Sequence, residues 1–145
     1  VAERVYQVRG FSLANVTFIE GDTGLIVVDP LQFTEHARAA IALYRRHRGD
    51  RPVAAVIYTH SHRDHYGGVR GVISQEDVQR GVKVIAPFGF TEESFSESIL
   101  AGVAMRRRAM FQFGCPWSPG RCHMWIAAWA RRSAVVATDS SRRQP

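Results

Sequence analysis

The stretch that decides how this chain is interpreted reads Thr59-His60-Ser61-His62-Arg63-Asp64-His65-Tyr66. Three imidazoles and one carboxylate fall within six positions, and the stretch begins directly after the apolar run 53–58. Side chains two apart in an extended backbone share a face, so His60 and His62 can converge on one metal ion. Imidazole and carboxylate suit zinc and its neighbours. The stretch therefore predicts a metal-binding loop at the end of a strand.

The same loop also provides for a second ion. Asp64 and His65 follow at once, and Gly67-Gly68 supply the backbone freedom for a turn there. We expect Asp64 and His65 to face a second ion about 3.5–4 Å from the first, an arrangement that clamps a substrate oxygen and activates a bridging water. The alternative is a solvated loop that is merely rich in histidine, and four potential ligands at this spacing argue against it.

The residues around the loop predict an α/β arrangement. A β-meander is expected first, and a helix is expected to begin at the N-cap Thr34 and to end at Gly49. Runs 53–58 and 82–86 are typical of strands buried on both faces. The predicted strands are 4–8, 14–20, 24–29, 53–58 and 82–86, and the predicted helices are 34–48, 67–72, 74–80 and 91–110. The apolar positions with helical spacing that should face the sheet are Ala37, Ala40, Ile41 and Tyr44.

The motif His60-x-His62-x-Asp64-His65 after an apolar strand resembles the metal motif of the metallo-β-lactamase fold superfamily. The upstream segment 16–30 agrees, because it reads as two short strands around a Gly-Asp-Thr-Gly turn and ends with Asp29-Pro30. The resemblance implies that Asp29 holds the metal loop in position without binding the metal itself. On the residues alone, a simple turn residue before Pro30 is an equal explanation.

Flanking stretches narrow the resemblance to the alkyl sulfatase branch. They are Tyr58-Thr59-His60-Ser61-His62, Gly67-Gly68-Val69-Arg70-Gly71-Val72, Val84-Ile85-Ala86-Pro87 and residues 97–114. The resemblance covers about residues 4–114. It implies a hydrolase with two zinc ions that cleaves alkyl sulfate esters such as dodecyl sulfate with a metal-activated water, which Asp64 helps to position. It also implies a homodimer.

One departure from that branch concerns the substrate. The chain reads Ser96-Glu97-Ser98 where the family usually reads Ser-Glu-Asn, and an Asn at that place would help to hold the sulfate. Ser98 and Arg107 are therefore candidates for the sulfate site. For the run Arg106-Arg107-Arg108, a solvated helix face is the favoured alternative.

The resemblance also sets expectations for completeness. It implies an αββα sandwich of which residues 1–114 form the N-terminal half, because the family's remaining ligands, two acidic residues and a histidine, lie further along. After residue 114 the chain has only Asp139 and His123 of those types. We expect catalysis by these 145 residues to be absent. The alternatives are another hydrolase of the superfamily, of thioesterase or lactonase type, and a truncated product that folds poorly.

Residues 115–145 differ in character from the rest. They carry five arginines and one acidic residue, all three tryptophans and both cysteines, whereas residues 1–114 carry 14 basic and 12 acidic side chains. A segment that binds nucleic acid or an anionic membrane is one interpretation. Out-of-frame translation, which yields a disordered tail, is the interpretation we favour. Cys115 and Cys122 have a spacing that permits a disulfide, and His123 beside them makes a zinc-like cluster.

The composition excludes some classes of function. Most of the excess positive charge lies in residues 115–145, so the net charge of +6 does not predict a nucleic-acid partner. No apolar run of about 18 residues occurs, so a soluble protein without a membrane span is expected. The cellular compartment is left open.

Three further groups of residues have two interpretations each. The phenylalanines after the last predicted strand line an alkyl-binding pocket or, as we favour, belong to the core. The glutamates of the next helix are replacement ligands or, as we favour, surface charges. The basic run before Gly49 binds phosphate or, as we favour, is a solvated helix end. The three groups are Phe88, Phe90 and Phe95; Glu92, Glu93 and Glu97; and Arg45-Arg46-His47-Arg48.

Overall fold

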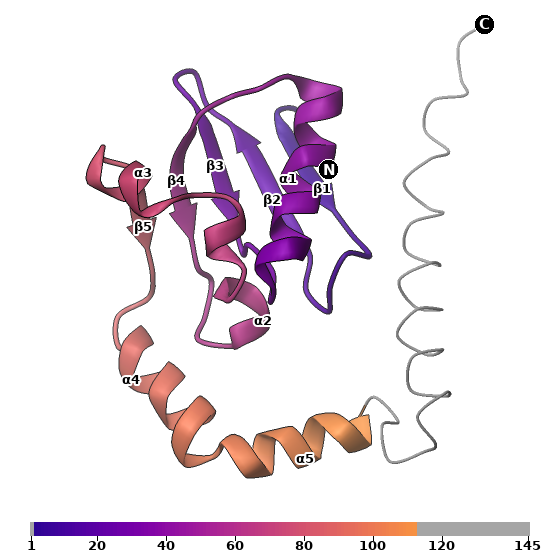
Figure 1. The fold of residues 1–145 in the computed structure, drawn as a ribbon, viewed down its shortest axis with the longest axis vertical. Helices are drawn as coiled ribbons and strands as arrows, with labels where there is room; N and C mark the ends of the chain where they lie inside the picture. Colours follow the sequence, from indigo (N-terminus) through magenta and orange to yellow (C-terminus); the bar gives the residue numbers. More distant parts are fainter. Residues whose placement is uncertain (1, 113–145) are drawn as a thin grey trace, which may run out of the picture. The chain divides into compact units, whose positions relative to one another are not determined.

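The computed structural model describes residues 2–112, which fall into two compact units divided after Ser94 (Figure 1). The first unit contains a sheet, its covering helix and the predicted metal loop. The second unit is helical as far as it is described. The predictions for Cys115, Cys122, His123, Asp139 and the rest of 115–145 lie outside the described residues.

The first unit contains one five-stranded mixed sheet in the order β1-β2-β3-β4-β5. Strands β1, β2 and β3 form the predicted antiparallel meander, whereas β4 runs parallel to β3 and β5 parallel to β4. Parallel neighbours need a crossover connection, which here contains α1 between β3 and β4. The α/β class is confirmed. The strands are Val5–Val8, Val16–Glu20, Leu25–Val28, Val53–Ile57 and Lys83–Ile85.

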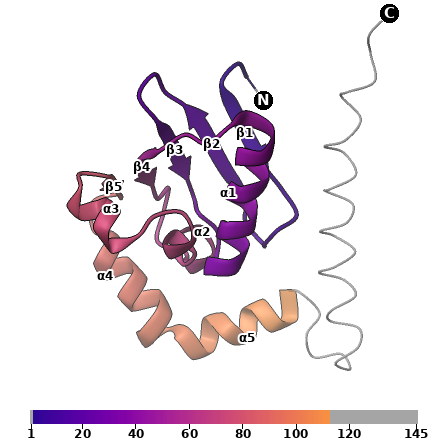
Figure 2. The same ribbon diagram turned by 45° about the horizontal axis from the view of Figure 1, so that its top comes forward.

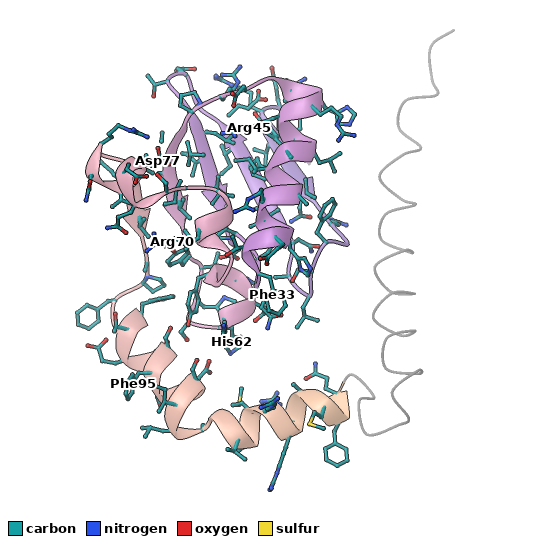
Figure 3. All side chains as sticks on the ribbon, viewed as in Figure 1. Phe33, Arg45, His62, Arg70, Asp77 and Phe95 are labelled. Atoms are coloured by element: carbon teal, nitrogen blue, oxygen red, sulfur yellow. The ribbon has the colours of Figure 1, made fainter. Side chains whose placement is uncertain are left out.

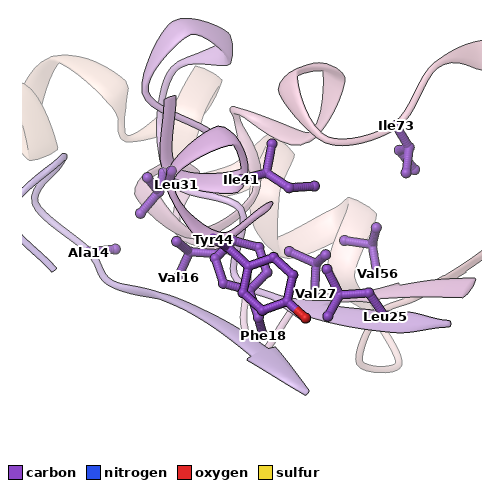
Figure 4. Packing of buried hydrophobic residues seen from close by; sticks show 11 residues of the cluster. Ala14, Val16, Phe18, Leu25, Val27, Leu31, Ile41, Tyr44, Val56 and Ile73 are labelled. Carbon is purple, nitrogen blue, oxygen red and sulfur yellow. The ribbon is translucent and has the colours of Figure 1, made fainter. Parts of the chain in front are cut away.

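Helix α1 spans Thr34–Arg48, as predicted, and lies along one face of the sheet (Figure 2). Thr34 is its first helical residue rather than the N-cap, because the extended Phe33 holds that place without a side-chain cap. Gly49 ends the helix with a φ of 86°. The four positions predicted to face the sheet are buried. Ala40, Ile41 and Tyr44 pack with alternate residues of β2, β3 and β4, which are Val16, Phe18, Leu25, Val27 and Val56 (Figure 4). Ala37 lies instead beside Gly68 and Gly71.

The last turn of α1 is anchored to the sheet by a buried carboxylate. Glu20 is 6% exposed and accepts hydrogen bonds from Tyr44 Oη at 2.8 Å and Arg48 Nε at 3.1 Å. The bonds from Arg48 and Tyr44 lower the pKa of Glu20, and burial together with the bond to Glu20 raises the pKa of Tyr44 to about 12. The Arg48 guanidinium also lies 4.6 Å from the Tyr6 ring centre. The side chain of Arg48 is still 45% exposed, as a solvated helix end predicts, and its ion pair with Glu20 is an addition that the sequence did not predict.

Strands β4 and β5 are more exposed than their apolar sequences predicted. Only Val56 of β4 is buried, and all three residues of β5 are exposed. The reason is that α1 covers one face of the sheet, and residues 2–112 supply no second sheet for the other. The prediction of strands buried on both faces was therefore wrong for the described residues.

Short helices follow β4 and β5. The short helix predicted at 67–72 is confirmed in part, as the 3-10 turn Val69–Gly71, and a separate turn, Arg63–Tyr66, precedes Gly67-Gly68. The predicted helix at 91–110 is interrupted by a π-helical turn. Helix α3 is held by a capping box between Ser74 and Asp77, which lowers the pKa of Asp77 to about 2. The elements are α2 Arg63–Tyr66, η1 Val69–Gly71, α3 Gln75–Gln79, α4 Phe90–Phe95, η2 Ser96–Leu100 and α5 Gly102–Gln112. No described helix has the length and apolar character needed to span a membrane.

The glycines after the metal loop serve close packing rather than turning. Gly67 and Gly68 have ordinary negative φ angles of −59° and −88°, so the prediction that they supply backbone freedom was wrong. A Cβ atom on Gly68 would overlap the carbonyl oxygen of Pro30, and one on Gly71 would overlap that of Thr34. The chain therefore passes against the start of α1 too closely for any side chain.

We expect Gly71→Ala to lower the free energy of unfolding by about 1–3 kcal/mol, because the new methyl group meets backbone that cannot move aside. The matched control is Gly102→Ala, where the nearest atom to a new Cβ lies 3.9 Å away. Urea denaturation of both variants measures the difference. Equal midpoints for the two variants would show that the contact at Gly71 is not tight.

Candidate metal centre

The predicted metal loop lies between β4 and α2 in the first unit. His60 and His62 are in the loop, and Figure 3 labels His62 close to α2. His62 has an extended backbone, with φ −72° and ψ 131°. Asp64 and His65 were expected in a turn, and they lie instead in the single turn of α2. All four predicted ligands therefore come from one continuous segment.

The structure brings the four side chains together as two pairs. His60 Nε2 lies 3.0 Å from His62 Nδ1, and His65 Nε2 lies 3.5 Å from Asp64 Oδ2. The rings of His60 and His65 have centres 4.1 Å apart, so the two pairs adjoin. This pairing is the one that the sequence assigned to two separate ions.

Asp29 connects the end of β3 to this loop. It is 8% exposed and has a positive φ of 54°, a conformation that Asp tolerates better than most residues. Its Oδ1 accepts from the Thr59 backbone N–H at 2.9 Å, and its Oδ2 accepts from Thr59 Oγ1 at 2.7 Å. Oδ2 also lies 2.9 Å from His65 Nδ1. One buried carboxylate thus holds both ends of the metal loop.

These bonds determine which nitrogen carries the proton in two of the imidazoles. A carboxylate only accepts, so His65 Nδ1 must be the donor to Asp29. Thr59 has a single hydroxyl proton, which it gives to Asp29, so it must accept from His60 Nδ1 at 2.9 Å. In the neutral form of both rings Nε2 then carries the lone pair, as a metal ligand requires.

The donor set fits zinc in chemistry and in spacing. Zn–N bonds of about 2.0–2.1 Å in a tetrahedron place two ligand nitrogens about 3.3 Å apart. The distance between His60 Nε2 and His62 Nδ1 is 3.0 Å, close to that value. Within residues 2–112 no group of three or more such side chains is arranged to hold a metal ion. That the loop offers two ligands to each of two ions stays a prediction.

The sequence offered three glutamates as replacement ligands, and that interpretation stays a prediction. Glu93 is exposed, yet its Oε2 accepts a hydrogen bond from Ser61 Oγ at 3.3 Å. Glu92 is exposed on the same helix, and Glu97 is partly buried in η2. The link between Glu93 and the loop was missed at the sequence level, because nothing in the pattern couples residues 32 positions apart.

The three phenylalanines differ in environment. Phe90 stacks on Tyr58 with ring centres 5.4 Å apart and meets Tyr66 edge-on at 5.0 Å. Phe88 is fully exposed and Phe95 is 56% exposed, so the prediction of core aromatics was wrong for these two. The prediction that the three line an alkyl pocket is untested.

The candidates for sulfate binding lie in the second unit. Ser98 is exposed in η2 and Arg107 is exposed in α5, and their part in binding stays a prediction. The π-helical turn coincides with Ser96-Glu97-Ser98, where the sequence departs from the family pattern. Such turns are rare and often accompany functional sites.

Comparison with known proteins defines the class. Residues 9–109 match the family model of the Metallo-beta-lactamase superfamily, and the chain belongs to that superfamily. Within it the chain falls in the alkyl sulfatase branch. It is 53% identical over 120 residues to the alkyl/aryl-sulfatase BDS1 of Saccharomyces cerevisiae, which covers 82% of this chain and 19% of the yeast protein.

Bacterial relatives agree. The chain is 55% identical over 115 residues to the (R)-specific secondary-alkylsulfatase of a Pseudomonas species, covering 79% of this chain and 17% of that protein. The solved structure of the stereoselective inverting sec-alkylsulfatase Pisa1 from Pseudomonas superposes with a TM-score of 0.72 at 54% identity, over 79% of this chain and 18% of that one. The chain thus spans less than a fifth of the length of these relatives.

We expect Thr59→Val to weaken zinc binding about 10–100-fold, the usual effect of losing a partner that orients a metal-bound histidine. Valine keeps the shape but removes the bonds of the hydroxyl to Asp29 and His60. Thr59→Ser keeps the hydroxyl and should bind within about threefold of the parent chain. Competition with a chromophoric chelator measures both affinities. Equal loss in the Val and Ser variants would contradict the role given to the hydroxyl.

Proposed function

We propose that this chain carries the metal loop of a zinc-dependent alkyl sulfatase, which hydrolyses the sulfate esters of alkyl chains. The observation that carries the proposal is the network of Asp29 and Thr59, which presents Nε2 of both His60 and His65 as ligands. Identities of 52–55% to three alkyl sulfatases support the substrate class. A small-molecule ester is therefore the proposed partner.

We assign one zinc ion to each of the two pairs of side chains. His60 and His62 would hold one zinc ion, and Asp64 and His65 would hold the other. Bound zinc supplies Lewis acidity and lowers the pKa of a coordinated water. The Asp64 carboxylate, 3.5 Å from His65 Nε2, would orient that water by accepting one of its protons in a hydrogen bond. Asp29 would hold the His65 ring in place while this happens.

The substrate would be recognised by residues of more than one element. A sulfate ester has an anionic head and an apolar tail, so its site needs cationic or hydrogen-bonding groups beside an apolar wall. Ser98 and Arg107 remain the proposed partners of the head. The homodimer implied by the resemblance is likewise a proposal.

We expect the isolated 145-residue chain to bind zinc weakly and to release no sulfate from dodecyl sulfate. The reason is that each ion receives two ligands from the described residues, whereas a catalytic zinc site uses about three protein ligands. Elemental analysis together with a sulfate-release assay measures both properties. Two zinc ions per chain with turnover would show that other residues of this chain complete the site.

The substrate class is tested in a chimera in which residues 4–114 replace the matching segment of the Pseudomonas secondary-alkylsulfatase. We expect that chimera to hydrolyse alkyl sulfates, because this chain is 55% identical to that enzyme over 115 residues. The His60→Ala chimera is the matched control and should lose activity. A folded, zinc-loaded chimera that cleaves acyl-glutathione or a lactone but no sulfate ester would overturn the proposal in favour of another hydrolase of the superfamily.

A further inference from the structure

We propose that helix α4 braces the metal loop, and that Glu93 is a positioning residue for His60 and His62. The inference rests on the metal centre proposed above and deepens it. All the residues involved lie in the first unit. Glu93 is assigned no part in binding the metal itself.

The brace acts on the residue between the two histidines. Ser61 is 6% exposed, and its Oγ donates a hydrogen bond to Glu93 Oε2 at 3.3 Å. Its carbonyl oxygen accepts a hydrogen bond from Ser94 Oγ at 3.2 Å. Two consecutive residues of α4 thus hold the side chain and the backbone of Ser61.

An aromatic contact adds a third point of attachment. Phe90 packs against Tyr58 and Tyr66, which stand just before and just after the metal loop, and whose own ring centres are 5.7 Å apart. Phe90, Glu93 and Ser94 are spaced i, i+3 and i+4, so they share one face of α4. That face therefore contacts the loop at its middle and at both ends.

The position of Ser61 explains how the brace would act on the ligands. The backbone bends at His60 and Ser61 and is extended at His62. Ser61 is buried, whereas His62 is exposed and His60 is half-buried. Fixing Ser61 against α4 therefore fixes the backbone that joins the two imidazoles, whose nitrogens lie 3.0 Å apart.

The test is a double-mutant cycle with Ser61→Ala, Glu93→Ala and the double variant in the full chain. Two properties are measured: zinc affinity by chelator competition, and hydrogen exchange of the amides of residues 60–63 in the metal-free chain. We expect Glu93→Ala to weaken zinc binding about threefold to tenfold, less than the loss of a direct partner of a ligand. The double variant should be no weaker than Ser61→Ala, because both changes remove the same bond.

Two further variants separate positioning from general stability. Glu93→Gln keeps an acceptor for Ser61 Oγ and should restore both properties. Glu92→Ala, one residue earlier on α4, should leave both unchanged. Faster exchange confined to residues 60–63 supports the brace, whereas faster exchange that extends equally to β2 and β3 would overturn it.

The outcomes distinguish this inference from the proposed function. If Glu93→Ala matches Glu92→Ala in zinc affinity and in exchange, the brace is overturned and the metal centre stands. If the parent chain binds no zinc, the proposed metal centre fails in this chain, and exchange alone decides the brace. Accelerated exchange in Glu93→Ala then supports it, and unchanged exchange overturns it.

Discussion

The parallel pairing of β3 and β4 is the constraint on which the site depends. It brings the carboxyl ends of both strands to one edge of the sheet, where the Asp29 N–H donates to the Ile57 carbonyl at 3.0 Å. Directly afterwards the chain bends so tightly that the Leu31 N–H reaches the Asp29 carbonyl at 2.8 Å, with a φ of 62° at Leu31. Such a φ is costly for leucine, and complete burial of its side chain offsets the cost.

Close packing then fixes the far side of the loop. The Gly68 N–H donates to the Leu31 carbonyl at 2.8 Å, so the segment after α2 is tied to the bend before α1. Only glycine fits at Gly68 and Gly71, because carbonyl oxygens occupy the space of a side chain. The metal loop is consequently held at its start by Asp29 and beyond its end by glycine packing.

Periodicity and local chemistry predicted the parts of the fold that depend on neighbours in sequence. The meander, the bounds of α1 and the buried face with Ala40 and Tyr44 all follow from patterns of two or four residues. Burial of β5 was mispredicted because it depends on a layer that residues 2–112 do not contain. The closeness of His60 to His62 was predictable from their spacing, whereas the contact between Ser61 and Glu93 depends on how α4 packs.

The positions of the imidazole protons decide which ring nitrogens of the loop are free to bind a metal ion. With the Nδ1 protons of His60 and His65 fixed by Thr59 and Asp29, the 3.0 Å contact between His60 Nε2 and His62 Nδ1 requires His62 to be the donor. Zinc in the proposed site would need a lone pair on His62 Nδ1, so binding would have to remove that proton or transfer it to Nε2. The other two rings already present the correct nitrogen. Only His62, which is exposed, would have to lose or move a proton before it could bind the ion. The hydrogen bonds to Thr59 and Asp29 already hold the Nδ1 protons of His60 and His65.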